Sequence, residues 1–225
     1  MLHAMGIECW VSRLSADLEP SAPATDALTS ASVGVSIDNM DWDALSACVA
    51  ACRDCELHAG RTQTVFGVGA REARWLILGE APGAEEDKRG EPFVGRAGQL
   101  LNSMLAAIGL TRDMVYIANI LKCRPPQNRD PRPEEALACE RYLSRQIALL
   151  KPRIILAVGR IAAQNLLKTE TPIARLRGKL HSYADTGIPV VVTYHPAYLL
   201  RSPGEKAKAW TDLQFARETF RALPT

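Results

Sequence analysis

The sequence predicts an α/β protein, a three-layer α/β/α sandwich with a central, mostly parallel sheet of four strands. Three observations lead to this fold class. Short apolar segments alternate along the chain with longer segments of helical periodicity. The apolar segments show no alternation of polar and apolar residues, which is typical of strands buried on both faces. With 225 residues, the chain is long enough for one domain with a substantial core.

The first half of the expected domain has a clear order of helices and strands. Asp41 is a suitable N-cap for a helix that runs to about Ala51. The apolar segment 74–79 is expected to be a strand that ends in a glycine-rich turn. Residues 95–108 are expected to form a helix, because Leu101, Met104 and Ile108 share one face. Residues 115–120 are expected to form the second strand.

The second half repeats the alternation. A helix is expected over residues 133–150, where Pro133 and Glu134 suit the first turn. The apolar residues 154–158 predict a third strand, followed by a helix over residues 160–167. Residues 190–193 predict a fourth strand, and residues 206–223 predict the last helix.

Residues 1–40 are expected to be a tail and linker, and the folded domain is placed at residues 41–225. Residues 17–39 are rich in Ala, Ser, Thr and Pro without periodicity, as in a flexible linker. The formal net charge of +2 and the pI of about 8.2 do not by themselves indicate a nucleic-acid partner. No apolar run approaches the roughly 20 residues of a membrane span, and no secretory signal is visible. We therefore expect a cytoplasmic protein, and a monomer.

The cysteines form a candidate metal site. The chain has six of them: Cys9, Cys48, Cys52, Cys55, Cys123 and Cys139. The first two are expected to be spectators, and disulfides are disfavoured in a reducing cytoplasm. Cys52 and Cys55 form a C-x-x-C motif, Cys123 follows an expected strand, and Cys139 lies in the next helix. Four thiolates can hold zinc or a [4Fe–4S] cluster, and spacing does not distinguish the two. The alternative is that Cys123 and Cys139 are simply core residues.

Three polar segments each follow an expected strand, at the edge of a parallel sheet where ligands bind. The first is GEAPGAEEDKRGEPFVGRAG, residues 79–98. Its acids could simply keep a loop soluble, but Phe93 has no obvious core partner there. Asn119 ends the second strand, and its amide offers the donor and acceptor needed to read a nucleobase edge. His195 follows the last strand, opposite the other two segments.

These segments carry a family resemblance. GEAPGAEEDKRGEPFVGRAGQLL, YIANILKCRPPQNRDP and TYHPAYLLR resemble the three signature segments of family 4 uracil-DNA glycosylases. Cys52, Cys55, Cys123 and Cys139 occupy the places of that family's cluster ligands. The resemblance extends from about Asp41 to the C-terminus. It implies a [4Fe–4S] cluster rather than zinc, and an enzyme that hydrolyses the N-glycosidic bond of uracil in DNA to leave an abasic site, initiating base excision repair.

The resemblance also implies how the base is recognised. The uracil leaves the DNA stack, because its glycosidic bond cannot be reached inside a duplex. Phe93 is expected to stack on the uracil, Asn119 to pair with its N3 and O4 edge, and Glu86 to exclude the methyl group of thymine. Gly79, Glu80 and Ala81 are expected to line the pocket with backbone amides.

Glu80 and His195 are the expected catalytic residues. The resemblance implies that His195 donates a hydrogen bond to the uracil anion as the bond breaks. Other branches of the superfamily place Asp or Asn where this chain has Ala81. Glu80 is therefore the nearest candidate to orient water, or it acts electrostatically.

Contacts to DNA are expected around the last two segments. Residues 196–201 are expected to form a loop that enters the duplex, with Leu199 or Leu200 filling the gap left by the base. The candidates for phosphate contacts are Lys122, Arg124, Arg129 and Arg201.

Three other readings remain open. A related branch binds uracil-DNA covalently through its histidine, but it carries a basic, His-containing insertion that is absent from residues 121–139. Another branch accepts a broader range of bases, and Glu80 and Glu86 argue against it. A non-enzymatic scaffold for replication proteins would leave Phe93, Asn119 and His195 without a purpose.

The N-terminal segment has a separate resemblance. LHAMGIECWVSR resembles the leading segment of a bacterial clamp-loader accessory subunit, which docks a partner subunit. The hypothesis is that Ile7 and Trp10 bind a replication or repair protein. The alternative is a disordered tail.

Overall fold

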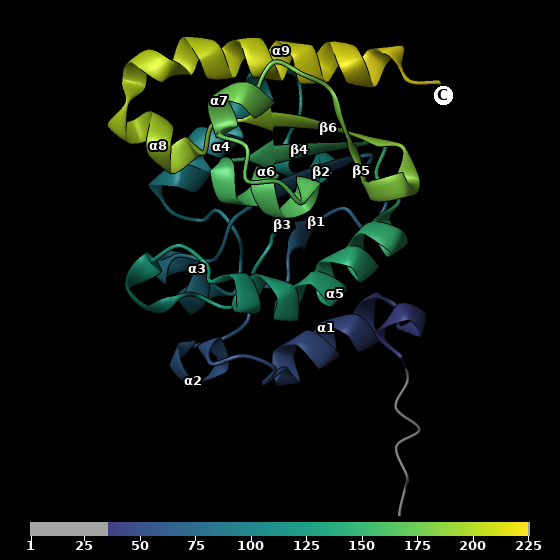
Figure 1. Cartoon of the computed structure of the whole chain (residues 1–225), viewed down its shortest axis with the longest axis vertical. Helices are drawn as coiled ribbons and strands as arrows, with labels where there is room; N and C mark the ends of the chain where they lie inside the picture. The colour runs from purple at the N-terminus through teal and green to yellow at the C-terminus, as the bar shows by residue number, and fades with distance from the viewer. Residues whose placement is uncertain (1–35, 225) are drawn as a thin grey trace, which may run out of the picture. The chain divides into compact units, whose positions relative to one another are not determined.

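The computed structural model describes residues 36–224, and within them a six-stranded sheet has the order β1-β3-β2-β4-β6-β5 (Figure 1). The inner strands β3, β2, β4 and β6 run parallel, as expected. Two short antiparallel strands that the sequence did not predict extend the sheet, β1 on β3 and β5 on β6. The strands are β1 (Val68–Gly69), β2 (Trp75–Gly79), β3 (Tyr116–Asn119), β4 (Ile154–Val158), β5 (His181–Tyr183) and β6 (Ile188–Thr193).

The helices of at least eight residues are those that the sequence predicts. They are α1 (Trp42–Ala51), α4 (Arg96–Ala107), α5 (Pro133–Leu150), α6 (Arg160–Leu167) and α9 (Lys206–Ala222). The Asp41 carboxylate accepts hydrogen bonds from the backbone N–H groups of Asp43 and Ala44, so its expected capping role is confirmed. Shorter helices are α2 (Leu57–Gly60), α3 (Ala84–Arg89), α7 (Ile173–Leu176) and α8 (Pro196–Arg201). Short 3₁₀ turns cover Ile37–Asn39, Arg112–Met114, Pro126–Asn128, Ala184–Thr186 and Pro203–Glu205.

Residues 196–201 form helix α8, so the expectation of a loop there is wrong. Proline favours the first turn of a helix, because its fixed φ fits and its missing N–H needs no partner there. The His195 side chain also accepts a hydrogen bond from the backbone N–H of Ala197, which caps the helix. A helix of six residues is too short to leave a periodic pattern in the sequence.

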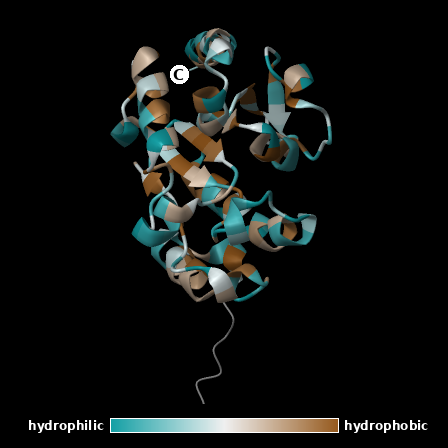
Figure 2. Cartoon of the chain, turned by 90° about the vertical axis from the view of Figure 1, so that its left-hand side faces the viewer, coloured by the Kyte–Doolittle hydropathy of each residue, from teal (hydrophilic) through white to brown (hydrophobic). Residues whose placement is uncertain are grey.

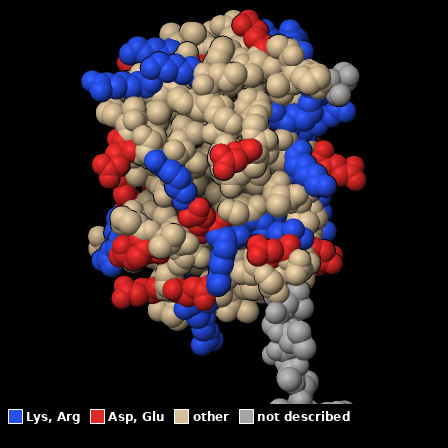
Figure 3. Space-filling model, turned by 45° about the vertical axis from the view of Figure 1, so that its right-hand side comes forward, with Lys and Arg blue, Asp and Glu red and all other residues tan. Residues whose placement is uncertain are grey.

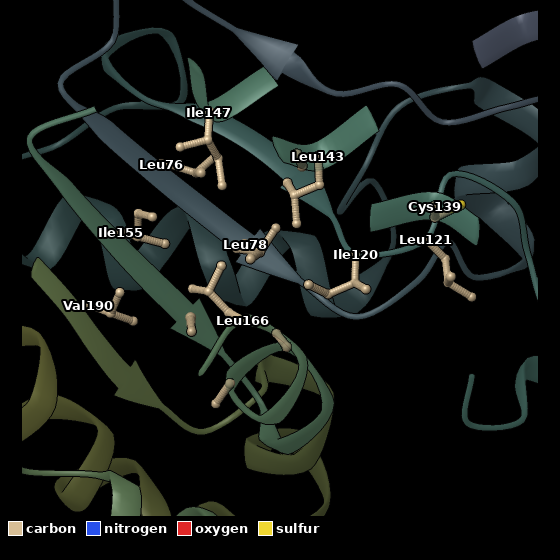
Figure 4. Packing of buried hydrophobic residues seen from close by; sticks show 14 of the residues in the cluster. Leu76, Leu78, Ile120, Leu121, Cys139, Leu143, Ile147, Ile155, Leu166 and Val190 are labelled. Atoms are coloured by element: carbon tan, nitrogen blue, oxygen red, sulfur yellow. The ribbon is translucent and has the colours of Figure 1, made fainter. Parts of the chain in front are cut away.

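Helices cover both faces of the sheet, which confirms the three-layer α/β/α architecture. On one face, Leu76 and Leu78 of β2 pack with α5, α6 and α7, and Figure 4 shows Leu143 and Ile147 of α5 beside them. On the other face, Ile77 and the β2 and β4 side chains that point to the same side pack with α4, α8 and α9. In Figure 2 the strands are largely hydrophobic, and hydrophilic residues lie on the outer sides of the helices.

Residues just before Asp41 also pack on the folded domain. Ile37 and Met40 pack with Leu45 and Val49 of α1 against Tyr142 of α5. The carbonyl of Met40 also accepts a hydrogen bond from Arg145 at 2.7 Å. The N-terminal segment with Ile7 and Trp10, and Cys9, lies outside the described residues. Among helices of residues 36–224, none combines the length and apolar character of a membrane span.

The sheet order determines where a site is expected. From β2, the chain adds β3 on one side and then β4 on the other, so the order reverses at β2. Ligands of open α/β sheets bind at the carboxyl ends of the strands at such a reversal. Gly79 ends β2, and it pairs with Asn119 at the end of β3.

Candidate active site

A cavity of about 420 Å³ lies at this reversal. Its walls come from three segments that are far apart in sequence, the β2–α4 region, the loop after β3 and the start of α8. The lining residues are Glu80, Ala81, Gly83, Glu86, Phe93, Ala97, Asn119, Asn128, Asp130, His195, Ala197, Tyr198 and Arg201. The structure therefore brings together the three segments that the sequence singled out.

Asn119 places an unpaired amide oxygen in the wall of the cavity. Its side chain is only 2% exposed, and its Oδ1 atom has no hydrogen-bond partner within the described chain. Gly79 makes room for it, because a Cβ atom at Gly79 would lie 2.3 Å from Oδ1 and 2.6 Å from the Phe93 ring. Gly79 thus lies against both of these side chains, but it does not itself line the cavity. A buried acceptor without a partner is costly, so this oxygen is prepared for a donor on a ligand.

The Phe93 ring is fixed in place before any ligand arrives. Its backbone adopts φ 55°, a left-handed conformation that is uncommon outside glycine. Arg112 holds this conformation by donating hydrogen bonds to the carbonyls of Pro92 and Phe93. Gly98 allows the close approach, since a Cβ atom there would lie 1.7 Å from the Phe93 carbonyl oxygen. The ring is buried and lies 5.5 Å from the His195 ring, at 30° to it.

His195 is an uncharged hydrogen-bond donor. Burial, aided by the positive charge of Arg201, lowers the pKa of His195 to about 4. The imidazole is therefore neutral at physiological pH. Its Nδ1 accepts from the Ala197 N–H at 3.1 Å, which assigns the ring proton to Nε2. The neutral ring thus has one N–H to offer in the cavity.

Glu80 titrates near neutral pH. Burial, and after it the nearby carboxylate of Asp130, raises the pKa of Glu80 to about 7 against the opposing charge of Arg160. Asp130 and Arg160 form an ion pair with a 2.6 Å separation between Oδ2 and Nη2. A carboxyl group with this pKa can be ionised in the free enzyme and still exchange a proton easily.

Two of the three acidic residues of α3, Glu86 and Asp87, have defined roles in the structure. Glu86 lines the cavity, and its carboxylate accepts a hydrogen bond from the backbone N–H of Val94 at 3.3 Å. Asp87 is buried and accepts from the backbone N–H of Thr62 at 2.9 Å. Asp87 therefore joins α3 to the preceding loop, and it is not an acid that keeps a loop soluble.

Sequence comparisons agree with this geometry. A sequence profile described as the uracil DNA glycosylase superfamily matches residues 66–214. The chain belongs to the uracil-DNA glycosylase superfamily. A type-4 uracil-DNA glycosylase of Archaeoglobus fulgidus is 50% identical over 161 residues, which cover 69% of this chain and 81% of that protein. A type-4 uracil-DNA glycosylase of Thermotoga maritima is 45% identical over 67% of this chain and 79% of that protein. A type-5 uracil-DNA glycosylase of Thermus thermophilus is 36% identical over 57% of this chain and 73% of that protein.

Several residues of this glycosylase site were missed by the sequence analysis. They are Gly83, Ala97, Asn128, Asp130, Ala197 and Tyr198. Asn128 and Asp130 stand in the quoted segment YIANILKCRPPQNRDP, but no pattern distinguished them from surface residues. Tyr198 is 36% exposed, and its ring lies 5.0 Å from that of Tyr194. Its position in the cavity wall depends on α8, which the sequence did not predict.

The candidate DNA contacts of this superfamily member need two corrections. Lys122 is 1% exposed and bonded internally, so it cannot reach a phosphate. Leu199 is 1% exposed and packs in the core beneath α8, so it cannot enter a duplex, whereas Leu200 is 36% exposed. Both errors arise because a residue's burial depends on how its segment folds. Basic and acidic side chains are interspersed on the face shown in Figure 3, so no single basic surface there marks a binding site.

The candidate arginines differ in their availability. Arg201 lines the cavity and is exposed. Arg124 is half-buried and donates from Nε to the Asn128 side chain at 2.7 Å. Arg129 makes two hydrogen bonds to the buried carboxylate of Glu135, at 2.8 and 2.5 Å. Arg129 thus helps to fix the segment between β3 and α5.

The four candidate metal ligands surround one small hollow of this glycosylase domain, on the far side of the loop that carries Asn119. Its walls include Cys52, Cys55, Arg61, Lys122, Cys123, Cys139 and Tyr142. Arg61 donates a hydrogen bond to the Cys123 sulfur at 3.1 Å. Burial raises the pKa of Cys139 to about 11, and it lowers the pKa of Lys122 to about 8, so Lys122 remains charged at neutral pH. Within residues 36–224, the cysteines are all free, and no three acidic, His or Cys side chains are grouped as ligands of one metal ion.

Proposed function

We propose that the protein removes uracil from DNA by hydrolysing its N-glycosidic bond, which leaves an abasic site and begins base excision repair. The observation that carries this proposal is the buried, unpaired Oδ1 of Asn119 in a cavity that the fixed ring of Phe93 and the neutral imidazole of His195 also line. Membership of the superfamily and the similarity to type-4 uracil-DNA glycosylases support the same activity.

Asn119 would distinguish uracil from cytosine. The base must leave the helix stack before its glycosidic bond can be reached. Oδ1 would then accept the N3–H of uracil, and the amide N–H would donate to O4. Cytosine presents the reverse pattern at these atoms, an acceptor at N3 and a donor at N4. The mismatch leaves buried polar groups unpaired, which costs about 1–3 kcal/mol for each group.

Phe93 and Glu86 would complete the recognition of the base. The Phe93 ring offers a flat apolar face in the wall of the cavity, on which the uracil ring would stack. The Glu86 carboxylate, held by the Val94 N–H, would stand near C5 and exclude the methyl group of thymine. Glu80 and Ala81 would contribute backbone amides beside them.

His195 and Glu80 would act on the two ends of the breaking bond. As the bond breaks, negative charge develops on the uracil ring and positive charge on the sugar. The Nε2–H of neutral His195 would stabilise the anion without giving up its proton. The Glu80 carboxylate would stabilise the sugar cation and orient the attacking water. This role requires the ionised form of Glu80.

DNA contacts would be made around the mouth of the cavity. Arg201 is placed to contact a phosphate next to the extruded nucleotide, and Arg124 is a second candidate. Leu200 is the leucine that is exposed enough to occupy the space left by the base. Arg129 would act indirectly, by fixing the loop through Glu135.

The four thiols fit a [4Fe–4S] cluster. All four line one hollow, and the type-4 relatives together with the family resemblance favour a cluster over zinc. Arg61 and Lys122 also line the hollow, and their positive charges would favour thiolates once a cluster is bound. When bound by Cys52, Cys55, Cys123 and Cys139, the cluster would be a structural cross-link. It would tie residues 52–55 to the loop that carries Asn119, and hydrolysis itself needs no electron transfer.

One assay tests the proposal. The purified protein is incubated with oligonucleotides that contain a single uracil, cytosine or thymine, and abasic sites are then cleaved with alkali. We expect multiple turnovers on uracil and no cleavage on the other two. A protein–DNA adduct that survives denaturation, without turnover, would instead indicate the covalent binding branch. Comparable release of other deaminated bases would indicate the broader branch.

A further inference from the structure

Lys122 is the one fully buried lysine or arginine side chain in the described part of the chain, and the catalytic proposal does not use it. It is 1% exposed. Its ammonium donates hydrogen bonds to the backbone carbonyl of Asn119 at 2.9 Å and to Oε1 of Gln146 at 2.6 Å. Both acceptors are neutral, and no Asp or Glu of the described residues forms an ion pair with it. A buried charge is normally compensated by a charge of opposite sign.

The candidates for that opposite charge are sulfur atoms. Lys122 shares its hollow with all four cysteines, and Cys123 and Cys139 are buried beside it. The neutral hydrogen-bond partners fix the direction of the side chain. Gln146 is itself held, because its amide donates to the Phe66 carbonyl at 2.9 Å and to the Tyr116 hydroxyl at 3.3 Å.

The same ammonium is bonded to the residue that reads the base. Asn119 and Cys123 are four positions apart, and Lys122 closes the turn between them through its bond to the Asn119 carbonyl. Backbone hydrogen bonds from Ile120 to Gly79 and from Leu121 to Glu80 anchor the rest of this turn to the end of β2. Lys122 is therefore the side chain that joins the thiolate side of the turn to the base-reading side.

We propose that Lys122 is a positioning residue, whose ammonium is the counter-cation of the cluster thiolates and holds the Asn119 carbonyl in place for base recognition. This inference rests on the proposed function, because it takes the cysteines as cluster ligands and Asn119 as the reader of the base. Without thiolates beside it, the ammonium would have no charge to compensate its burial.

The primary test is the variant Lys122→Met, which keeps the length of the side chain and removes its charge. Lys179→Met is the matched control, because Lys179 is an exposed lysine that does not line the hollow. The holoprotein is purified without oxygen, and the loss of cluster absorbance and of bound iron is followed after addition of a chelator. We expect the cluster lifetime to fall about tenfold or more in Lys122→Met and to stay unchanged in Lys179→Met.

The reduction potential of the cluster is a second readout that a merely structural role would not change in a defined direction. Removal of a nearby positive charge disfavours the added electron, so we expect a more negative potential in Lys122→Met. Gln146→Glu provides an independent test, because a carboxylate at 2.6 Å from the ammonium would neutralise it without altering Lys122. It should move the potential in the same direction, and this variant decides the matter if Lys122→Met does not fold.

Binding of free uracil tests the link to Asn119. In variants with full iron content, we expect the dissociation constant of free uracil, measured by calorimetry, to rise several-fold while Lys179→Met stays at the wild-type value. Unchanged cluster lifetime and potential in both Lys122→Met and Gln146→Glu would overturn the counter-cation role, and unchanged uracil binding would overturn the role toward Asn119. These measurements need no excision, so failure of the wild-type protein to release uracil from DNA would refute the proposed function separately.

Discussion

The loop after β3 separates two sites that are built in opposite ways. On one side, the cavity of about 420 Å³ contains an amide oxygen without a partner and a carboxyl group with a pKa of about 7. On the other side, Cys123 has Arg61 as a donor, and Lys122 has two acceptors. The cavity suits a ligand that binds and dissociates, whereas the thiol site suits a permanently bound group.

This difference predicts two kinds of failure. Changes in the cavity should lower the rate of excision and leave the fold intact, because the groups there make few bonds to the rest of the chain. Changes in the thiol site should lower stability first, and activity only as a consequence. Substitutions at Asn119, Cys139 and His195 and around Glu80 test this division, and the largest expected change in free energy comes first.

The largest effect is expected for Asn119→Asp. The carboxylate would have no N–H to donate to O4 of uracil, so kcat/KM for uracil should fall about 1,000-fold, or about 4 kcal/mol. Steady-state excision measures the loss, and thermal unfolding should show that the fold persists. Asn39→Asp, at an exposed position, is the control. Full uracil excision by Asn119→Asp would show that this amide does not read the base.

Cys139→Ser should show the opposite failure. Loss of one thiolate should release the iron and lower the free energy of unfolding by about 3 kcal/mol, a decrease of roughly 6–12 °C in the melting temperature. Calorimetry and iron content check this outcome. Cys48→Ser should change neither, because Cys48 does not line the hollow. A Cys139→Ser protein with wild-type stability and iron content would remove Cys139 from the ligand set.

His195→Ala should lower kcat about 100-fold, or about 2.7 kcal/mol, because one donor to the developing anion is lost. His195→Gln should recover part of this loss, since its amide can still donate a hydrogen bond. Single-turnover kinetics at saturating enzyme would separate this effect from DNA binding. An equal loss in both variants, or none in either, would contradict a donor role for Nε2.

The smallest effect concerns the pH dependence of excision. The proposed mechanism requires ionised Glu80, so the rate should fall below a pH of about 7 as the carboxylate gains a proton. Asp130→Asn removes a negative neighbour and should lower the pKa of Glu80, whereas Arg160→Gln removes a positive one and should raise it. Solvent screens both exposed groups, so the acid limb should move by about half a pH unit in each direction.

Other charged and titratable groups also line the cavity that contains Glu80. Glu86 and Arg201 also line the cavity and remain unchanged in both variants. His195, with a pKa of about 4, stays neutral across the range and adds no limb. Shifts in the same direction for Asp130→Asn and Arg160→Gln would exclude Glu80 as the group that titrates.

Much of the fold was predictable from the sequence because its signals are local. The strands β2, β3, β4 and β6 are buried on both faces, and this makes them visible as uninterrupted apolar runs. The edge strands β1 and β5 have two and three residues, so they leave no pattern. They form because a neighbouring strand offers free backbone hydrogen-bonding groups. The sequence of such a short segment carries no signal of that neighbour.

Many residues of the site were predictable from the sequence, but which of them are buried was not. Gly79, Phe93, Asn119 and His195 stand out because each residue type is unusual for its place. Lys122 and Leu199 look like surface candidates in the sequence, and only the packing of the turn after β3 and of α8 shows that they are buried. Asp130 acquires its role through its distance to Glu80, which no spacing in the chain indicates.

A crystal structure of the protein with bound uracil would test the central claim most directly. The account predicts that the ring lies against Phe93, with N3 about 2.9 Å from Asn119 Oδ1 and O2 within hydrogen-bond distance of His195 Nε2. Uracil bound elsewhere, or bound in this cavity with Asn119 Oδ1 still unpaired, would contradict it.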